Sequence, residues 1–288
     1  MSRIADELLT RRPELLDIDG AYGVSERAVR RVTALAAPLA AYFRFRAGGF
    51  ERVPEGPCLI VANHSVGALF EVPLLLRAWR LGMGARPVRG LIHRIAYEPP
   101  LSWVRTWEIG GVLAHPPVAR RVLDRGQPLL VFPGGDLDAC RPFRDRYRVV
   151  FGGRTGFVRL AREAGVPIVP AVIGGAHAAY VVLPGGSSLA RLLGAERHLG
   201  LKALPLTAGM PLALAAAVAT AVHPPAWPAL AAALANTLVP APARIELEIL
   251  EPLRVREDES DAEAAERVRA TMETALGRIA ARRLTPWE

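Results

Sequence analysis

Residues 58–64 read Cys-Leu-Ile-Val-Ala-Asn-His, a short apolar run that ends on an asparagine and a histidine. The run follows a glycine and a proline at positions 56 and 57, which are residues that interrupt regular structure. A run of this length after such breakers is typical of a buried β-strand. We therefore expect His64 to stand at the end of a strand, where a loop begins.

Similar apolar runs recur along the chain, separated by segments with helical periodicity. The predicted strands are residues 58–62, 90–93, 129–132 and 168–173, and the predicted helices are residues 69–81, 117–125 and 155–164. Strands that alternate with helices at this spacing predict a parallel sheet with helices on its faces. The expected fold class is α/β, with a mostly parallel central sheet flanked by helices and an N-terminal helical extension.

The C-terminal part of the chain adds one strand and one helix to this prediction. Residues 244–250 alternate apolar and charged side chains, as an edge strand does. A final helix starts at Ser260, where Ser-Asp-Ala-Glu forms a capping box with Glu263. Its apolar face is expected to pack on the body of the protein and comprises Val268, Met272, Leu276 and Ile279.

The composition excludes several classes of protein. The 288 residues, 51% hydrophobic and 22% charged, are too apolar for a disordered chain. The only cysteines, Cys58 and Cys140, are too few and too far apart for a disulfide framework or a zinc site. Basic residues outnumber acidic ones by 36 to 28, and Lys202 is the only lysine, so phosphate groups or a membrane surface are favoured partners. Nucleic acid is not expected, because the arginines are not interleaved with aromatic residues.

Residues 203–243, hereafter the uncharged segment, contain no Asp, Glu, Lys or Arg. A His-Pro-Pro sequence at residues 223–225 divides the segment into residues 209–222 and 226–239. As a helix each piece would be about 21 Å long, short of the ~30 Å hydrocarbon core of a bilayer. A shallow re-entrant or interfacial pair of helices fits these lengths, and a pair of core helices fits them equally well.

A second apolar stretch, residues 34–43, has arginines on both sides. Such arginines can hold lipid headgroups while the middle of the helix enters the acyl boundary, although an ordinary amphipathic helix has the same pattern. We divide the chain into an N-terminal extension, residues 1–43, expected to anchor at the membrane interface, and residues 44–288. The polar start does not resemble a secretory signal, so we expect a peripheral or monotopic protein on the cytoplasmic face of a membrane.

The loop after the first predicted strand carries the candidate catalytic residues. A histidine at a strand end can act as a general base, and its second ring nitrogen then needs a hydrogen-bond acceptor. The first carboxylate downstream of His64 is Glu71. In an unbroken helix the two residues would be ~10 Å apart, so a contact requires that residues 65–68 form a loop. A structural or surface histidine is the alternative interpretation.

A second candidate site follows the predicted strand at residues 129–132. Two consecutive glycines after a strand allow a backbone nest whose amides face an anion, and arginines downstream add positive charge. A plain turn followed by a solvated loop is the alternative. The candidate substrate-binding residues are Phe132, Pro133, Gly134, Gly135, Asp136, Arg141, Arg144 and Arg154.

Together these segments resemble the glycerolipid (PlsC-like) acyltransferase family. The signature of that family is Asn-His-x4-Asp-x-Pro, then Phe-Pro-Glu-Gly, then Val-Pro-Ile-Val-Pro. The equivalents in this chain are Asn63-His64, Glu71-Val72-Pro73, Phe132-Pro133-Gly134-Gly135 and Val166-Pro167-Ile168-Val169-Pro170. Nucleophile-elbow, dinucleotide, Walker and zinc-protease motifs are absent from the sequence.

The resemblance implies that His64 is a base that deprotonates an acceptor hydroxyl, and that Glu71 orients it. The hydroxyl would attack the thioester of acyl-CoA or acyl-carrier protein, with no metal, no covalent intermediate and no cofactor other than this co-substrate. The acceptor would be a glycerolipid, such as a lysophospholipid or a mono- or diacylglycerol, and membrane lipids would be partners.

This sequence departs from the family pattern at several positions. Two extra residues separate His64 from the acid, which is Glu instead of Asp. Gly134 stands where the family has Glu, and Leu137 stands where the common pattern has an arginine associated with the acceptor phosphate. The candidates to replace that arginine are Arg141, Arg144 and Arg154. The Phe-Pro-Gly-Gly form resembles the branch that includes neutral-lipid acyltransferases.

Two other functions are compatible with the sequence. One is a non-catalytic lipid-binding relative whose acid has moved to an unproductive position. The other is a thioester or ester hydrolase in which His64 activates water. An intact contact between His64 and a carboxylate would favour the enzyme over the non-catalytic relative.

Overall fold

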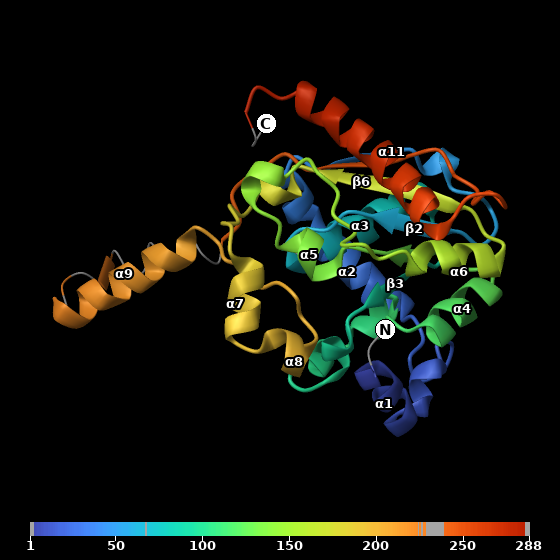
Figure 1. Cartoon of the computed structure of the whole chain (residues 1–288), viewed down its shortest axis with the longest axis horizontal. Coiled ribbons are helices and arrows are strands. Elements are labelled where there is room, and N and C mark those ends of the chain that lie inside the picture. The colour runs from blue at the N-terminus through green and yellow to red at the C-terminus, as the bar shows by residue number, and fades with distance from the viewer. Residues whose placement is uncertain (1–2, 67, 224, 226, 229–238, 286–288) are drawn as a thin grey trace.

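The protein has an α/β fold built on one mostly parallel sheet, as the sequence predicts (Figure 1). A computed structural model describes residues 3–66, 68–223, 225, 227–228 and 239–285. Within these residues, seven strands are hydrogen-bonded in the order β1-β7-β6-β2-β5-β3-β4. The strands are β1 (Arg46–Gly48), β2 (Leu59–Ala62), β3 (Arg89–Ile92), β4 (Gly111–Leu113), β5 (Leu129–Val131), β6 (Ile168–Gly174) and β7 (Glu246–Ile249). The strands from β6 to β4 are parallel, whereas β7 runs antiparallel to β6 and β1 is parallel to β7.

Helices α2 and α3 cover one face of this sheet, α4, α6 and α11 cover the other, and α9 projects from the body (Figure 1). The described helices are α1 (Arg3–Arg11), α2 (Glu26–Tyr42), α3 (Ala68–Met83), α4 (Pro116–Asp124), α5 (Gly135–Ala139), α6 (Gly156–Ala164), α7 (Gly186–Leu192), α8 (Ala195–Leu199), α9 (Gly209–Val222) and α11 (Asp261–Ala281).

Alternate residues of β2 face opposite sides of the sheet, and each side has its own apolar core. Leu59 and Val61 belong to the core that includes residues of α4, α6 and α11. Ile60 and Ala62 belong to the core beneath α3 and the C-terminal end of α2. All of β2 is therefore buried, which is the usual condition of a central parallel strand. The loop that follows β2 starts from a rigid position.

The N-terminal extension shares the first of these cores. Leu15 and Ile18, which follow α1, are 3% and 1% exposed and pack with residues of α4. The Arg89 guanidinium of β3 donates a hydrogen bond to the Ile18 carbonyl. The described part of the N-terminal extension is thus packed on the body of the protein by apolar contacts and by a buried polar one.

The strand predicted at residues 244–250 forms, but it is not an edge strand. β7 has β6 on one side and β1 on the other, where Arg46 is paired with Glu246. The exposed Arg-Ala-Gly sequence of β1 has no apolar pattern, so nothing in it predicted a strand. The alternation in β7 reflects a solvent-facing side of the sheet, where Glu246 and Glu248 form ion pairs with arginines at the end of α11.

The other predicted elements are confirmed, with ends that shift by one or two residues. α11 begins after Ser260 with the predicted capping box, and its four predicted core residues are buried. α3 begins at Ala68, so residues 65 and 66 remain outside the helix, as a contact between His64 and Glu71 requires. Sequence reasoning missed β4 and the short helices α5, α7 and α8, which have too few residues to show a period.

The uncharged segment starts from a stem that is bonded to the body. Leu183 N–H donates to the Leu206 carbonyl at 2.7 Å, and Ala208 N–H donates to the Val181 carbonyl at 2.8 Å. The predicted helix at residues 209–222 is α9. The piece predicted at residues 226–239 lies largely outside the described residues. Among the described residues, no helix is both long and apolar enough to cross a bilayer.

Candidate active site

The candidate catalytic residues lie where two neighbouring parallel strands end. Val61 of β2 is in register with Val131 of β5, and the chain leaves these strands at Asn63-His64 and at Phe132. Open parallel sheets place their sites at this edge, because the loops after adjacent strands meet there. The two motifs that the sequence analysis singled out are therefore side by side.

Asn63 binds the neighbouring strand with its side chain. Its amide nitrogen donates to the Ile173 carbonyl at 3.0 Å, and its side-chain oxygen accepts the Ile173 N–H at 2.8 Å. The residue is 1% exposed, so both bonds are shielded from water. Asn63 thus extends the pairing of β2 with β6 beyond the last backbone bond and fixes the position from which His64 projects. The sequence alone indicates no role for Asn63 beyond its place in the motif.

His64 and Glu71 are in direct contact. His64 Nδ1 lies 2.7 Å from Glu71 Oε2, and the same oxygen accepts the Ser65 N–H at 3.3 Å. An oxygen that accepts a backbone N–H is placed to accept from the imidazole too, so Nδ1 carries the proton and Nε2 is left as a base. The Glu71 side chain is only 2% exposed, which keeps water from competing for this bond.

The ring of His64 is held in one plane and is partly open to solvent. It stacks on Phe132 with ring centroids 4.5 Å apart, and 20% of the side chain is exposed. Among the described residues, none is hydrogen-bonded to Nε2. Burial lowers the pKa of His64, but the charge and hydrogen bond of Glu71, helped by the charge of Asp138, outweigh burial and raise the pKa above its ordinary value.

A second buried carboxylate, Asp138 of α5, holds the backbone of His64. Its Oδ2 accepts the His64 N–H at 2.6 Å, and its Oδ1 accepts the Val150 N–H at 2.9 Å and a guanidinium N–H of Arg141. The side chains of Asp138 and Arg141 are each 2% exposed. Sequence reasoning did not assign a role to Asp138. The only signal was an acid and an arginine three residues apart in a segment that was predicted as a loop.

The structure places Arg141 inside the protein, behind this carboxylate. Its guanidinium also donates to the carbonyls of Asp145 and Arg146 and to Nδ1 of His177, which is itself buried. This arrangement does not favour the expected contact with an anionic substrate, because the donors already have partners in the protein. Arg144, in contrast, is 77% exposed, and its binding of substrate stays a prediction.

Asp136 and Arg154 hold the Phe-Pro-Gly-Gly loop in its conformation. Arg154 donates to the carbonyls of Pro133 and Gly134 at 3.0 and 2.6 Å and pairs with Asp136 at 3.1 Å. The other Asp136 oxygen accepts the N–H of Ala203 at 2.9 Å. These two side chains therefore shape the Phe-Pro-Gly-Gly loop and attach it to the start of the uncharged segment.

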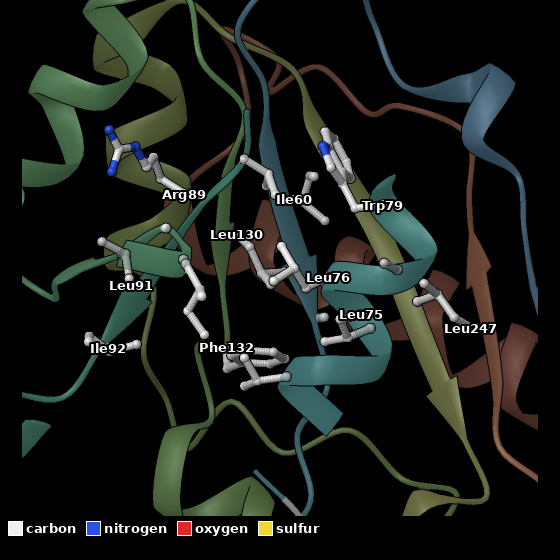
Figure 2. Close-up of a pocket in the computed structure, with 18 of the residues that line it drawn as sticks. Ile60, Leu75, Leu76, Trp79, Arg89, Leu91, Ile92, Leu130, Phe132 and Leu247 are labelled. Atoms are coloured by element: carbon white, nitrogen blue, oxygen red, sulfur yellow. The ribbon is translucent and has the colours of Figure 1, made fainter. Parts of the chain in front are cut away.

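An apolar cavity of about 160 Å³ lies between α3 and the sheet and extends to Phe132 (Figure 2). Leu75, Leu76 and Trp79 of α3 face Ile60 of β2 and Leu130 of β5 across it. Because Phe132 also stacks on His64, one ring separates the cavity from the imidazole. The described residues contain no group of three or more His, Cys, Asp or Glu arranged to hold a metal ion.

A family model described as Acyltransferase matches residues 44–174, which include β1, β2 with its His64 loop, α3, the Phe-Pro-Gly-Gly loop and β6. This stretch of the chain is therefore similar to the acyltransferase family. The crystal structure of PlsC, the 1-acyl-sn-glycerophosphate (LPA) acyltransferase of Thermotoga maritima, aligns with a TM-score of 0.51 over 96% of this chain and 94% of that chain. Its sequence identity is 16%, so this likeness shows the acyltransferase fold.

Two relatives show greater identity over shorter ranges. An uncharacterized protein of Mycobacterium tuberculosis is 34% identical over 174 residues, which are 60% of this chain and 47% of that protein. A chicken (Gallus gallus) protein described as a DGAT1/2-independent enzyme synthesizing storage lipids is 33% identical over 128 residues, 42% of this chain and 36% of that protein. This chain spans about half the length of the mycobacterial relatives it matches.

Within this acyltransferase motif, the glycine at position 134 has a packing reason. A Cβ at Gly134 would lie 2.0 Å from the Val150 carbonyl oxygen and 2.3 Å from the Cβ of Asp138. The glutamate that the acyltransferase pattern has at this position would not fit. The close approach of Val150 is the same approach that lets its N–H reach Asp138.

Replacing Gly134 by Ala is expected to destabilise the protein by ~1–3 kcal/mol, the usual cost of overpacking against backbone. The measurement is the melting temperature compared with that of Gly156→Ala, whose added Cβ meets no atom within 4 Å. Equal melting temperatures for the two variants would contradict the close approach of Val150 to Gly134.

Proposed function

We propose that the chain transfers a fatty acyl group from acyl-CoA or acyl-carrier protein to a hydroxyl group of a glycerolipid, with His64 as the general base. The observation that carries the proposal is the 2.7 Å contact between His64 Nδ1 and Glu71, which leaves Nε2 as the basic atom on a partly exposed ring. The acyltransferase match over residues 44–174 supports acyl transfer as the chemistry.

The reaction we propose has two proton transfers and one acyl transfer. Nε2 of His64 takes the proton of the acceptor hydroxyl while the hydroxyl oxygen attacks the thioester carbonyl carbon. The carbon–sulfur bond then breaks, and the imidazolium returns its proton to the leaving thiolate. Glu71 stabilises the imidazolium between these steps, and Phe132 keeps the ring in the plane that the two transfers need.

The intact contact argues against a non-catalytic relative. A lipid-binding protein without catalysis has no need of a buried carboxylate against an imidazole, because burying Glu71 carries a desolvation cost. Hydrolysis differs from transfer only in the acceptor, so it is distinguished by products: a hydrolase releases free fatty acid whether or not a glycerolipid is present.

His64→Ala is expected to lower acyl transfer by ~10²–10⁴-fold, the usual contribution of a general base. Glu71→Gln is expected to cost less and to move the acid limb of kcat/KM to lower pH, because the charge that raises the His64 pKa is removed. The measurement is transfer of a labelled acyl group from acyl-CoA to lysophospholipid and diacylglycerol between pH 5 and 9.

The matched control is His198→Ala, since His198 is exposed and lies outside the site. Near wild-type transfer by His64→Ala to every acceptor would sink the proposed mechanism. If Glu71→Gln is silent, His64 stays the base and another group orients it.

We further propose that the acyl chain of the donor occupies the apolar cavity beneath α3. Gly90 of β3 leaves room there, because it is in register with Leu130, which in turn is in register with Ile60. All three positions therefore face α3, and a Cβ at Gly90 would meet no atom within 4 Å. A thioester whose chain enters at Phe132 would have its carbonyl beside His64.

Gly90→Leu is expected to shift the preference of the enzyme toward shorter acyl chains, because the new side chain would fill part of the cavity. The measurement is kcat/KM for a series of acyl-CoA chain lengths. Gly277→Leu on α11 is the control, since a Cβ there also meets no atom within 4 Å. An unchanged chain-length profile for Gly90→Leu would place the acyl chain elsewhere.

We propose that α9 and the exposed side of α2 hold the protein on the cytoplasmic face of a membrane. Leu214, Val218 and Val222 of α9 are 69%, 58% and 81% exposed, and no charged residue of the segment accompanies them. Leu35 and Tyr42 of α2 are also exposed. The Tyr42 hydroxyl donates to the Pro240 carbonyl at 2.6 Å, so the end of α2 and the C-terminal end of the uncharged segment are adjacent.

The double substitution Leu214→Glu and Val218→Glu, at positions one turn apart on α9, is expected to release the protein from liposomes that contain anionic lipid. Burying each native side chain in the acyl region is worth ~1.5–3 kcal/mol, and a charge reverses the sign. Flotation at physiological salt is the measurement, and Leu81→Glu, at an exposed position of α3, is the control. Failure of the wild type to float with such liposomes would refute the membrane proposal.

A further inference from the structure

The strongest feature that the proposed mechanism leaves unused is the buried group formed by Asp138, Arg141 and His177. It contacts the backbone of His64 through Asp138 and comes from α5, the loop after it and the turn that follows β6. All three residues are 2–3% exposed. None of the three residues has a role in the proposed reaction, yet Asp138 accepts the backbone N–H of His64.

The hydrogen bonds define the protonation state of each member. Both oxygens of Asp138 face only N–H donors, from His64, Val150 and Arg141, so Asp138 is a carboxylate although burial raises its pKa. Nδ1 of His177 accepts from Arg141, so its Nε2 carries the proton and donates to the Asp138 carbonyl at 3.2 Å. Burial and the neighbouring Arg141 place the pKa of His177 well below its ordinary value, so this ring stays neutral.

We propose that Asp138 is a positioning residue for the base: it holds the peptide N–H of His64 and so fixes the imidazole where Glu71 and Phe132 meet it. Arg141 and neutral His177 hold Asp138 in turn. The inference rests on the proposed role of His64. It is separable from that role, because the position and titration of the ring can be measured without any acyl transfer.

The bond between the His64 N–H and Asp138 affects the position of the imidazole. The His64 N–H is not part of a strand ladder, since β2 ends at Ala62, and its bond to Asp138 at 2.6 Å is charge-assisted. The ring belongs to the same residue as this N–H and is held by Glu71 on one nitrogen and Phe132 on one face. A displacement of about 1 Å in a base can cost ~10²-fold in rate, so the backbone attachment bears directly on turnover.

The first test is Asp138→Asn. This variant keeps the shape of the side chain but places an amide NH₂ group against an N–H donor, and two donors cannot form a hydrogen bond. We expect kcat to fall by about 10²-fold with KM little changed, because Asp138 touches no substrate. The groups that face His64 are Glu71, Asp138, Arg141 and His177, and the variant removes one negative charge from them. The acid limb of the rate profile and the NMR titration of the His64 ring should therefore both move to lower pH.

The matched control is Glu259→Gln. Glu259 is also a largely buried carboxylate that pairs with an arginine and accepts a backbone N–H, but it lies before α11, outside the site. Glu259→Gln should leave the acid limb of the rate profile and the titration of the His64 ring unchanged. A purely structural role for Asp138 predicts loss of activity at every pH with an unmoved limb and ring titration, and that result would overturn the proposal.

A second measurement needs no variant. In the wild-type protein, the amide proton of His64 should exchange with solvent slowly, although the residue stands in a loop. Exchange at the rate of an unprotected amide would remove the basis of the proposal, and this measurement decides the matter if Asp138→Asn does not fold. If His64→Ala leaves acyl transfer intact while the ring of His64 still responds to Asp138→Asn, the positioning role stands and the proposed function fails.

Discussion

The alignment of β2 between β5 and β6 determines where everything in the site can be. A parallel strand that ends in the middle of a sheet leaves backbone donors and acceptors without ladder partners, and here they are buried, so they must bond to something other than water. The side chain of Asn63 pairs with Ile173, the N–H of His64 is accepted by Asp138, and the N–H of Ser65 is accepted by Glu71. Three consecutive residues are thus held in place by hydrogen bonds to three other parts of the chain.

This arrangement explains why buried charges are concentrated at the site. A buried donor that loses its acceptor costs ~1–3 kcal/mol, so Glu71 and Asp138 contribute to the fold as well as to the position of the imidazole. Their burial in turn requires compensation, which Arg141 supplies to Asp138 through its charge and hydrogen bond. The position of the imidazole and the stability of the loop therefore depend on the same bonds.

The sequence predicted the elements that have a clear period or a clear break, and failed where a role depends on contacts across the chain. The central strands, α3, α9, α11 and its capping box follow from apolar pattern and turn residues. The contact of His64 with Glu71 could be expected because only one carboxylate follows closely. Arg141 was expected to bind an anionic substrate, with a solvated loop as the alternative. Its burial depends on Asp138 and on His177, which is 36 residues away. β7 was wrongly predicted to be an edge strand, because the sequence of β1 has no pattern that predicts a strand beside it.

The pairing of charges around the imidazole has one more consequence. Arg141 neutralises Asp138, and Arg154 neutralises Asp136, so the carboxylate of Glu71 is left without a countercharge while His64 is neutral. In the proposed reaction, the site is electrically balanced only while His64 holds the proton taken from the acceptor. A resting site with surplus negative charge repels a phosphate, whereas an uncharged hydroxyl and thioester can approach it without this penalty. An acceptor that carries a phosphate would have to place it near cations outside this group, such as the exposed guanidiniums of Arg144 and Arg148.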